Sequence, residues 1–324
     1  MNCAYARRFA ALALACAIVP QAHAAWPDDK PIELIVGFAA GGETDVMARA
    51  LAPYLQKHLG GKATVAVINR PGASGEIANA YVQRAAPDGY TLGVVNTPPM
   101  AFVPLYKKTQ YDPAKFALIG RVVSDPTLLV VRADSPYQDL KQIAAALKEK
   151  PASVSVGQNG VGSNGNVAMN LWQREAGFRF NDVPFSGTGP SKTALLGKHI
   201  DMMFASMTAV PDPEKEAVPL RIVAQFMEDR AKGLPNVPTA KEQGFDVAVP
   251  SDRGLAVQSD VPADIQQRLR AALEAAMTDP AFLKTAQAFE SVLSYLPGDA
   301  WQKSLDDSRP GWQALASEVK DSEK

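Results

Sequence analysis

Short apolar runs alternate with amphipathic segments along the first third of the chain. The runs 31–38, 64–69 and 91–96 are typical of buried strands. Between them, the segments 44–59 and 76–85 carry apolar residues at helical spacing. This order of strand, helix, strand, helix and strand predicts parallel strands joined by right-handed crossovers.

The middle of the chain repeats this alternation, and the last third becomes helical. The expected strands there are 128–134, 153–157, 183–187, 200–206 and 220–226, with helices at 140–148, 166–176 and 191–197. A strand-like segment follows at 245–258, and helices are expected at 262–277, 281–290 and 301–319. The pattern therefore predicts an α/β fold of two units with a helical tail.

The first 24 residues have the features of a secretory signal peptide. Arg7 and Arg8 precede an apolar run at 9–19, and Ala22-His23-Ala24 fits a signal-peptidase site. A membrane anchor is the alternative, but the run is too short to span a bilayer. A lipoprotein modified at Cys16 fits poorly, because such proteins need Leu or a similar residue three positions before the cysteine, and Ala13 stands there. We expect an exported, periplasmic chain that begins near Ala25.

The composition excludes several classes of function. The chain has 324 residues, of which 47% are hydrophobic and 21% charged, as in a globular protein. Removing the leader leaves 31 of the 33 basic residues against 34 acidic ones, a net charge of −3. Nucleic acid is therefore not an expected partner. Both cysteines, Cys3 and Cys16, lie in the leader, so the mature chain has no thiolate nucleophile and no disulfide.

Three glycine-rich loops, 37–45, 71–75 and 157–165, each follow an expected strand and precede a helix. Helix N-termini present unpaired N–H groups, and glycine lets the backbone approach a ligand closely. Neutral Ser, Thr and Asn side chains surround these loops, which suits a carboxylate held by many neutral donors. The first loop lacks the lysine of a phosphate-binding P-loop, and the isolated GxGxxG match at 160–165 is weak.

Two acidic residues of the first loop allow more than one interpretation. Asp45 could act as a general base, or it could cap or buttress its own helix N-terminus. Glu43 would repel an anionic ligand, so it either points outward or meets a cationic group.

The mature chain lacks the parts of the common hydrolases. Its two histidines, His58 and His199, belong to no Ser-His-Asp or HExxH pattern, and no GxSxG is present. We expect neither a cofactor nor a metal, and no catalytic residue is assigned. Chemistry by a pair of Asp or Glu residues stays open, because the chain contains many carboxyl groups.

The motifs GGxTD at 41–45, NRPGAxG at 69–75 and APDGYTL at 86–92 occur in that order. Together with "GVGSNGNVA", "VPFSGTGPSKTALLGKHIDMMF" and "LPNVPTAKEQGF", they span nearly all of the mature chain. In this combination the sequence resembles the solute-binding receptors of tripartite tricarboxylate transporters, the Bug receptors.

The resemblance implies a periplasmic binding protein of type II topology, with two α/β domains around a ligand cleft. It implies domain 1 at 25–122 and 248–324, domain 2 at 123–247, and a signal peptide at 1–24. Its ligands are small organic acids, and its partners are the permease subunits of the transporter. We expect a monomer.

The resemblance also implies ligand contacts, position by position. In domain 1 they are Phe38, Gly41, Gly42, Glu43, Thr44, Asp45, Ala73, Ser74, Gly75, Asn96 and Thr97. In domain 2 they are Gly157, Gln158, Asn159, Gly162, Ser163, Asn164, Ser186, Gly187, Thr188, Phe204 and Ala205.

The sequence departs from the family pattern at several of these places. It has Ala39-Ala40 for two prolines, Glu43 for a glycine, Asn166 for a histidine, Ser186 for a lysine, and Asp252-Arg253 near a usual tryptophan. Arg253 could clamp a ligand carboxylate, or it could pair with Asp252 at the surface. Which acid is bound, and whether Glu43 and Asp252 select an amine-bearing ligand, stays open.

The hypothesis is a receptor that closes on a small organic acid and needs no nucleophile. The alternatives are a periplasmic hydrolase or lyase using Asp or Glu in the same cleft, and a subunit that presents its ligand to a sensor.

Overall fold

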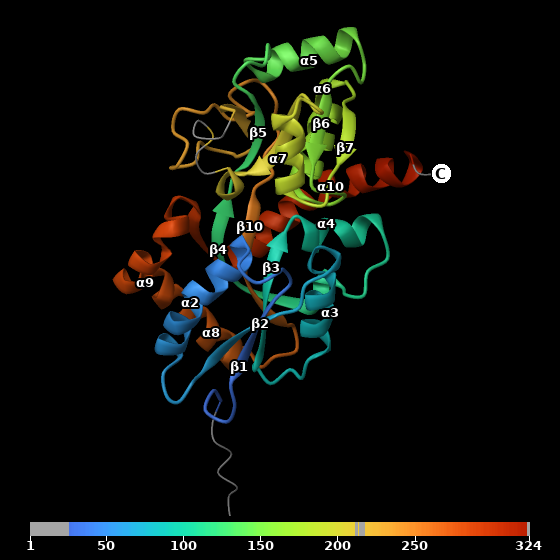
Figure 1. Cartoon of the computed structure of the whole chain (residues 1–324). Helices are drawn as coiled ribbons and strands as arrows, with labels where there is room; N and C mark the ends of the chain where they lie inside the picture. The colour runs from blue at the N-terminus through green and yellow to red at the C-terminus, as the bar shows by residue number, and fades with distance from the viewer. Residues whose placement is uncertain (1–25, 211–212, 214–217, 323–324) are drawn as a thin grey trace, which may run out of the picture.

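The computed structural model describes residues 26–322 except 211–212 and 214–217, so the expected signal peptide lies outside the described residues. Two mixed sheets form the framework (Figure 1). The first sheet has the order β11-β4-β10-β3-β1-β2. Its strands are β1 (Ile32–Val36), β2 (Val65–Asn69), β3 (Thr91–Thr97), β4 (Phe116–Asp125), β10 (Ser251–Gln258) and β11 (Leu293–Pro297).

The second sheet has the order β7-β6-β8-β5-β9. Its strands are β5 (Thr127–Arg132), β6 (Ser155–Gln158), β7 (Asn181–Pro184), β8 (Met202–Ser206) and β9 (Leu220–Gln225). Strand β1 runs parallel to β2 and β3, and β6 runs parallel to β7 and β8. The predicted parallel crossover units are therefore confirmed in both halves of the chain.

Helices connect these strands. Around the first sheet they are α2 (Glu43–Leu59), α3 (Glu76–Arg84), α4 (Pro99–Tyr106), α8 (Ala263–Thr278), α9 (Pro280–Thr285) and α10 (Gly298–Ser322). The second sheet has α5 (Leu140–Glu149), α6 (Asn164–Ala176) and α7 (Thr188–Leu196). The apolar spacing seen in the sequence explains α2, whose residues Met47, Leu51 and Leu55 are buried.

Several elements differ from the sequence prediction. The segment 245–250 is not a strand, and β10 begins only after Pro250. The helix expected at 281–290 ends at Thr285, and a 3-10 turn follows in which Phe289 has non-helical angles. The pattern did not predict β4, α4 or β11. Two prolines, Pro99 and Pro104, lie within α4 and argue against a helix in the sequence. Strand β11 follows a turn, and its own residues are at most partly buried.

The chain passes between the sheets in two places that lie side by side. It goes from β4 to β5 through Pro126, and it returns between β9 and β10. The hydroxyl of Thr127 donates to the carbonyl oxygen of Val249, which joins the two crossings. The division of domains at 122/123 and 247/248 stays a prediction, although β4 itself continues to Asp125.

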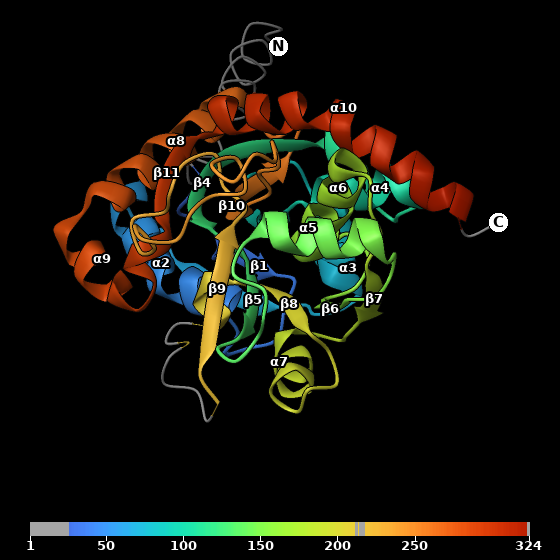
Figure 2. The same cartoon turned by 90° about the horizontal axis from the view of Figure 1, so that it is seen from above.

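The C-terminal helix α10 contacts both halves of the molecule. It packs on α4 and reaches α6, and Figure 2 shows it extending over both. Trp301, Trp312 and Leu315 of α10 share one buried apolar cluster with Phe102 of α4 and Trp172 of α6.

Gly254 of β10 lies in the centre of the first sheet, where its neighbours leave no room for a side chain. A Cβ there would collide with the carbonyl oxygen of Gly120 and lie 2.6 Å from the ring of Trp301. We expect Gly254→Ala to lower the free energy of unfolding by about 1–3 kcal/mol through overpacking. Thermal and urea unfolding measure this change.

Gly311 provides the matched control. It lies in α10 with open space around its Cβ position, so Gly311→Ala should stabilise the helix by about 0.5–1 kcal/mol. A Gly254→Ala variant that unfolds like the wild type would show that β10 and β4 can move apart at no cost.

Candidate functional site

A cleft of about 540 Å³ lies between the two sheets. Its first wall is formed by the segments after β1 and β2 and by the end of β3, and its second wall by the segments after β6 and β7 and by the end of β8. Strand β10 adds Ser251 and Arg253, and Arg253 lies opposite Asn96 of β3 in the sheet register. In open α/β sheets ligands collect beyond the carboxyl ends of the parallel strands, and this cleft occupies that position.

Many of the predicted contacts line this cleft. They are Phe38, Gly42, Glu43, Thr44, Ser74, Asn96, Asn159, Ser163, Asn164, Ser186, Gly187, Thr188 and Arg253. The other predicted residues do not line it. They are Gly41, Asp45, Ala73, Gly75, Thr97, Gly157, Gln158, Gly162, Phe204 and Ala205. For both groups, direct contact with a ligand stays a prediction.

The sequence interpretation missed several lining residues. They are Gly37, Ala39, Pro71, Gly72, Pro99, Ser206 and Ser251. Four of them, Gly37, Ala39, Pro71 and Gly72, lie inside the predicted loops 37–45 and 71–75 but were not among the predicted contacts, and Ser206 directly follows a predicted contact. Pro99 belongs to α4, which the pattern did not predict, and Ser251 lies in the strand-like segment predicted at 245–258, which was not assigned to the site at that residue.

Two of the helices that face the cleft begin at glycines, whereas a third, α6, is capped by the side chain of Ser163. Gly42 precedes α2 and Gly187 precedes α7, and neither helix has a side-chain cap. By contrast, Asp139 caps α5 and Asp279 caps α9, and neither aspartate lines the cleft. A helix without a side-chain cap leaves its first N–H groups and its partial positive charge available to an anion.

The amides at these two N-termini can be traced individually. The Gly42 amide donates to the carbonyl oxygen of Ala39 at 3.2 Å, so it is already used. Among the described residues, the amides of Glu43, Thr44, Thr188 and Gly189 have no acceptor. The available donors therefore come from both walls of the cleft.

Asp45 holds the first loop in place. Its buried carboxylate accepts from the Gly41 amide at 2.8 Å, from Arg49 Nε at 3.0 Å and from Asn69 Nδ2 at 2.8 Å. Burial works against ionisation of this carboxylate, but the hydrogen bonds from Arg49, Gly41 and Asn69 outweigh it and lower its pKa. The buttressing interpretation of Asp45 is confirmed.

Arg253 has different partners from those expected. Its Nη2 atom lies 2.6 Å from Asp125 Oδ2 and 2.9 Å from Glu43 Oε2. The predicted pair with Asp252 is wrong, because neighbouring residues of a strand point to opposite faces of the sheet. Asp252 instead binds Arg121 Nη1 at 3.1 Å. Glu43 does meet a cationic group, which is one of its two predicted interpretations.

The histidines lie elsewhere. His58 is 3.0 Å from Asp279, which also binds Lys57, and His199 does not line the cleft. No cluster of His, Cys, Asp and Glu among the described residues could hold a metal ion. Within the same part of the chain, every helix is too short or too polar to cross a membrane.

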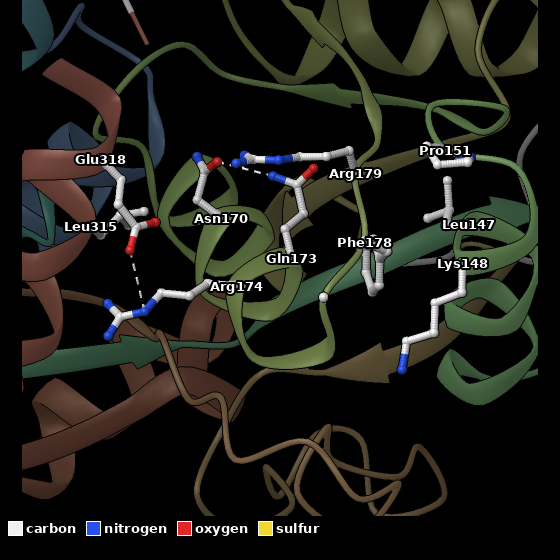
Figure 3. Close-up of a pocket in the computed structure, with 11 residues that line it drawn as sticks. Leu147, Lys148, Pro151, Asn170, Gln173, Arg174, Phe178, Arg179, Leu315 and Glu318 are labelled. Atoms are coloured by element: carbon white, nitrogen blue, oxygen red, sulfur yellow. Dashed lines mark hydrogen bonds and ion pairs between the residues drawn. The ribbon is translucent and has the colours of Figure 1, made fainter. Parts of the chain in front are cut away.

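A second hollow of about 450 Å³ lies beside α6 and α10 (Figure 3). The ion pair between Arg174 and Glu318, at 3.5 Å, crosses its edge. None of the predicted contact residues lines it, and no helix N-terminus of the glycine loops opens into it. The cleft between the sheets is therefore the candidate site.

Comparison with known proteins adds independent evidence. The sequence profile of the tripartite tricarboxylate transporter family receptor matches residues 47–311. A UPF0065 protein from the gbd 5′ region of Cupriavidus necator is 34% identical over 288 residues, covering 89% of this chain and 86% of the relative.

Solved structures agree with this match. A TctC solute-binding protein from Polaromonas, without ligand, has a TM-score of 0.78 and 32% identity, and the match covers 91% of this chain and 100% of that one. MatC of Rhodopseudomonas palustris, with bound malate, has a TM-score of 0.72 and 27% identity, with 88% and 98% covered.

The lowered pKa of Asp45 predicts how its contribution depends on pH. Asp45→Asn should lower the free energy of unfolding by about 1–3 kcal/mol at neutral pH, because charged hydrogen bonds are lost. The wild type should keep this extra stability at pH values above the ordinary aspartate pKa of 3.8, and lose it as the pH falls through the lower pKa that Asp45 has in the folded protein. Thermal unfolding at a series of pH values measures both.

Asp229→Asn, at an exposed carboxylate, is the control and should change stability little at any pH. A difference in the free energy of unfolding between the wild type and Asp45→Asn that stayed constant down to acid pH would contradict an ionised, hydrogen-bonded Asp45.

Proposed function

The chain belongs to the tripartite tricarboxylate transporter receptor family, and from this premise we propose which part of the molecule holds the solute and how. The protein is a solute-binding receptor with the fold of the periplasmic binding proteins. The solute is a small organic acid, and its carboxylate lies in the cleft between the two sheets. The acceptor-free amides that begin α2 and α7 donate to it.

These amides are the observation that carries the proposal. They lie at helix N-termini on opposite walls of the cleft, and no side chain caps either helix. A carboxylate is the kind of group that such N-termini bind. The hydroxyl groups of Ser186 and Thr188 and the amide group of Asn159, which donates to the Thr188 hydroxyl at 2.9 Å, provide further neutral partners nearby. MatC, whose structure contains malate, shows that a relative of this fold binds a carboxylate.

A solute held by both walls binds the closed form of the receptor more tightly than the open form. A shift from mostly open to mostly closed requires about 5.5 kcal/mol of differential binding. Hydrogen bonds to a charged group contribute about 1.5–3 kcal/mol each, so roughly two to four that form only on closure are enough. The side-by-side crossings near Pro126 and Val249 provide the hinge.

The receptor works in the periplasm and delivers its solute to the permease subunits of a tripartite transporter. Capture by closure requires no bond to be made or broken, so the protein releases its solute chemically unchanged.

Gly42 provides a test of the cleft. Gly42→Val should abolish binding of organic acids, because a branched side chain on the cleft wall blocks approach to the α2 amides. A thermal-shift screen of carboxylic and amino acids on the wild type identifies the ligand, since binding to the native state raises the melting temperature. Calorimetry of both proteins then gives the loss of affinity.

Gly311→Val, on an exposed face of α10, is the matched control and should keep full affinity. Full affinity in a folded Gly42→Val variant would show that this wall of the cleft is not part of the binding site. Mass spectrometry of the solute after denaturation should return the compound that was added. A converted product would indicate an enzyme instead.

Export makes a separate prediction. The protein recovered from the periplasm should begin near Ala25, because Ala22-His23-Ala24 forms the cleavage site. Intact mass spectrometry of the periplasmic fraction checks this. A chain that keeps residues 1–24, or one found only with the membrane, would contradict it.

A further inference from the structure

The walls of the cleft carry few charged groups. Among the described residues that line it, only Glu43 and Arg253 have charged side chains, and the others are apolar or neutral. The balance between these two groups and their buried neighbours therefore determines which net charge of solute the cleft accepts.

The charge of Arg253 is already balanced by Asp125. The two side chains are 4% and 0% exposed, and they are joined at 2.6 Å. Asp125 also accepts hydrogen bonds from the amide and the hydroxyl of Thr208, so both of its carboxyl oxygens have partners. Breaking this buried pair would leave Asp125 uncompensated, which is strongly unfavourable, so Asp125 keeps the charge of Arg253 balanced whichever of its N–H groups faces the cleft.

Glu43 is therefore the surplus charge. Its side chain is 41% exposed, and it reaches the same Arg253 Nη2 atom at 2.9 Å. One guanidinium between two carboxylates leaves a net charge of −1. Glu43 is also the first residue of α2, so it lies beside the N-terminus that would otherwise attract a ligand carboxylate.

We propose that Glu43 makes the cleft selective for zwitterionic solutes, namely acids that carry an ammonium group beside the carboxylate, over purely anionic acids. The ammonium group lies beside the Glu43 carboxylate. The solute carboxylate takes the acceptor-free amides, above all that of Thr188 on the opposite wall. A purely anionic acid meets a like charge at Glu43 and gains no compensating cation, since Arg253 is already paired.

This inference rests on the proposed function, and matched pairs of solutes test it. Aspartate differs from malate by an ammonium in place of a hydroxyl, and 4-aminobutyrate differs from glutarate by an ammonium in place of a carboxylate. The wild type should bind the amine-bearing member of a pair more tightly in calorimetry or thermal shift. Glu43→Gln should weaken the amine-bearing member and strengthen the anionic member, each on the order of tenfold, or about 1.4 kcal/mol.

Glu76→Gln is the matched control. Glu76 is also the first residue of its helix, α3, but it does not line the cleft and binds the Gln110 amide instead. It removes the same charge from a comparable position, so the preference within each pair should stay as in the wild type.

The outcomes separate the two proposals. Tighter binding of the anionic member by the wild type, with no change in Glu43→Gln, would overturn the role of Glu43 and leave organic-acid capture intact. A preference for amines that Glu43→Gln leaves unaltered would also overturn it. If no acid of either class, nor any in the wider screen, binds the wild type, both the proposed function and this inference fail.

Discussion

The buried ion pair between Arg253 and Asp125 holds together the place where the two sheets meet. Arg253 lies on β10 and Asp125 at the end of β4, while Thr208, which donates to Asp125, lies in the 3-10 turn that follows β8 of the second sheet. A charge buried to this extent must be paired, and removal of one partner typically costs about 3–5 kcal/mol. The pair therefore fixes the strands around the cleft and holds the Arg253 side chain in place.

The N-termini of the helices differ in how their first amides are satisfied. At the cleft, the side chain of Ser163 caps α6. Asp139 and Asp279 cap helices that do not face the cleft, and there the protein satisfies its own amides. At α2 and α7 a glycine stands in the cap position, so the first amides lack an acceptor in the described structure. A glycine at the N-cap position costs only a few tenths of a kcal/mol relative to Ser, Thr, Asp or Asn. These two positions therefore leave their first amides available to a ligand at little cost in stability.

Local sequence patterns were sufficient for the parallel strands and for the loops that follow them. Hydrophobic runs predicted β1, β2 and β3, and the glycines after them predicted most of the first wall of the cleft. The partners of Arg253 could not be predicted in this way, because Asp125 lies 128 positions away in the chain. Only the antiparallel pairing of β10 with β4 brings them together, and β4 has Gly, Arg, Ser and Asp among its apolar residues.

The shared apolar cluster under α10 has a consequence for how the molecule comes apart. Trp301 and Trp312 of one helix pack in the same cluster as Phe102 near the first sheet and Trp172 near the second. Loss of this helix would expose aromatic surface in both halves at once. The two halves are therefore coupled in unfolding as one cooperative unit, even though a ligand cleft lies between them.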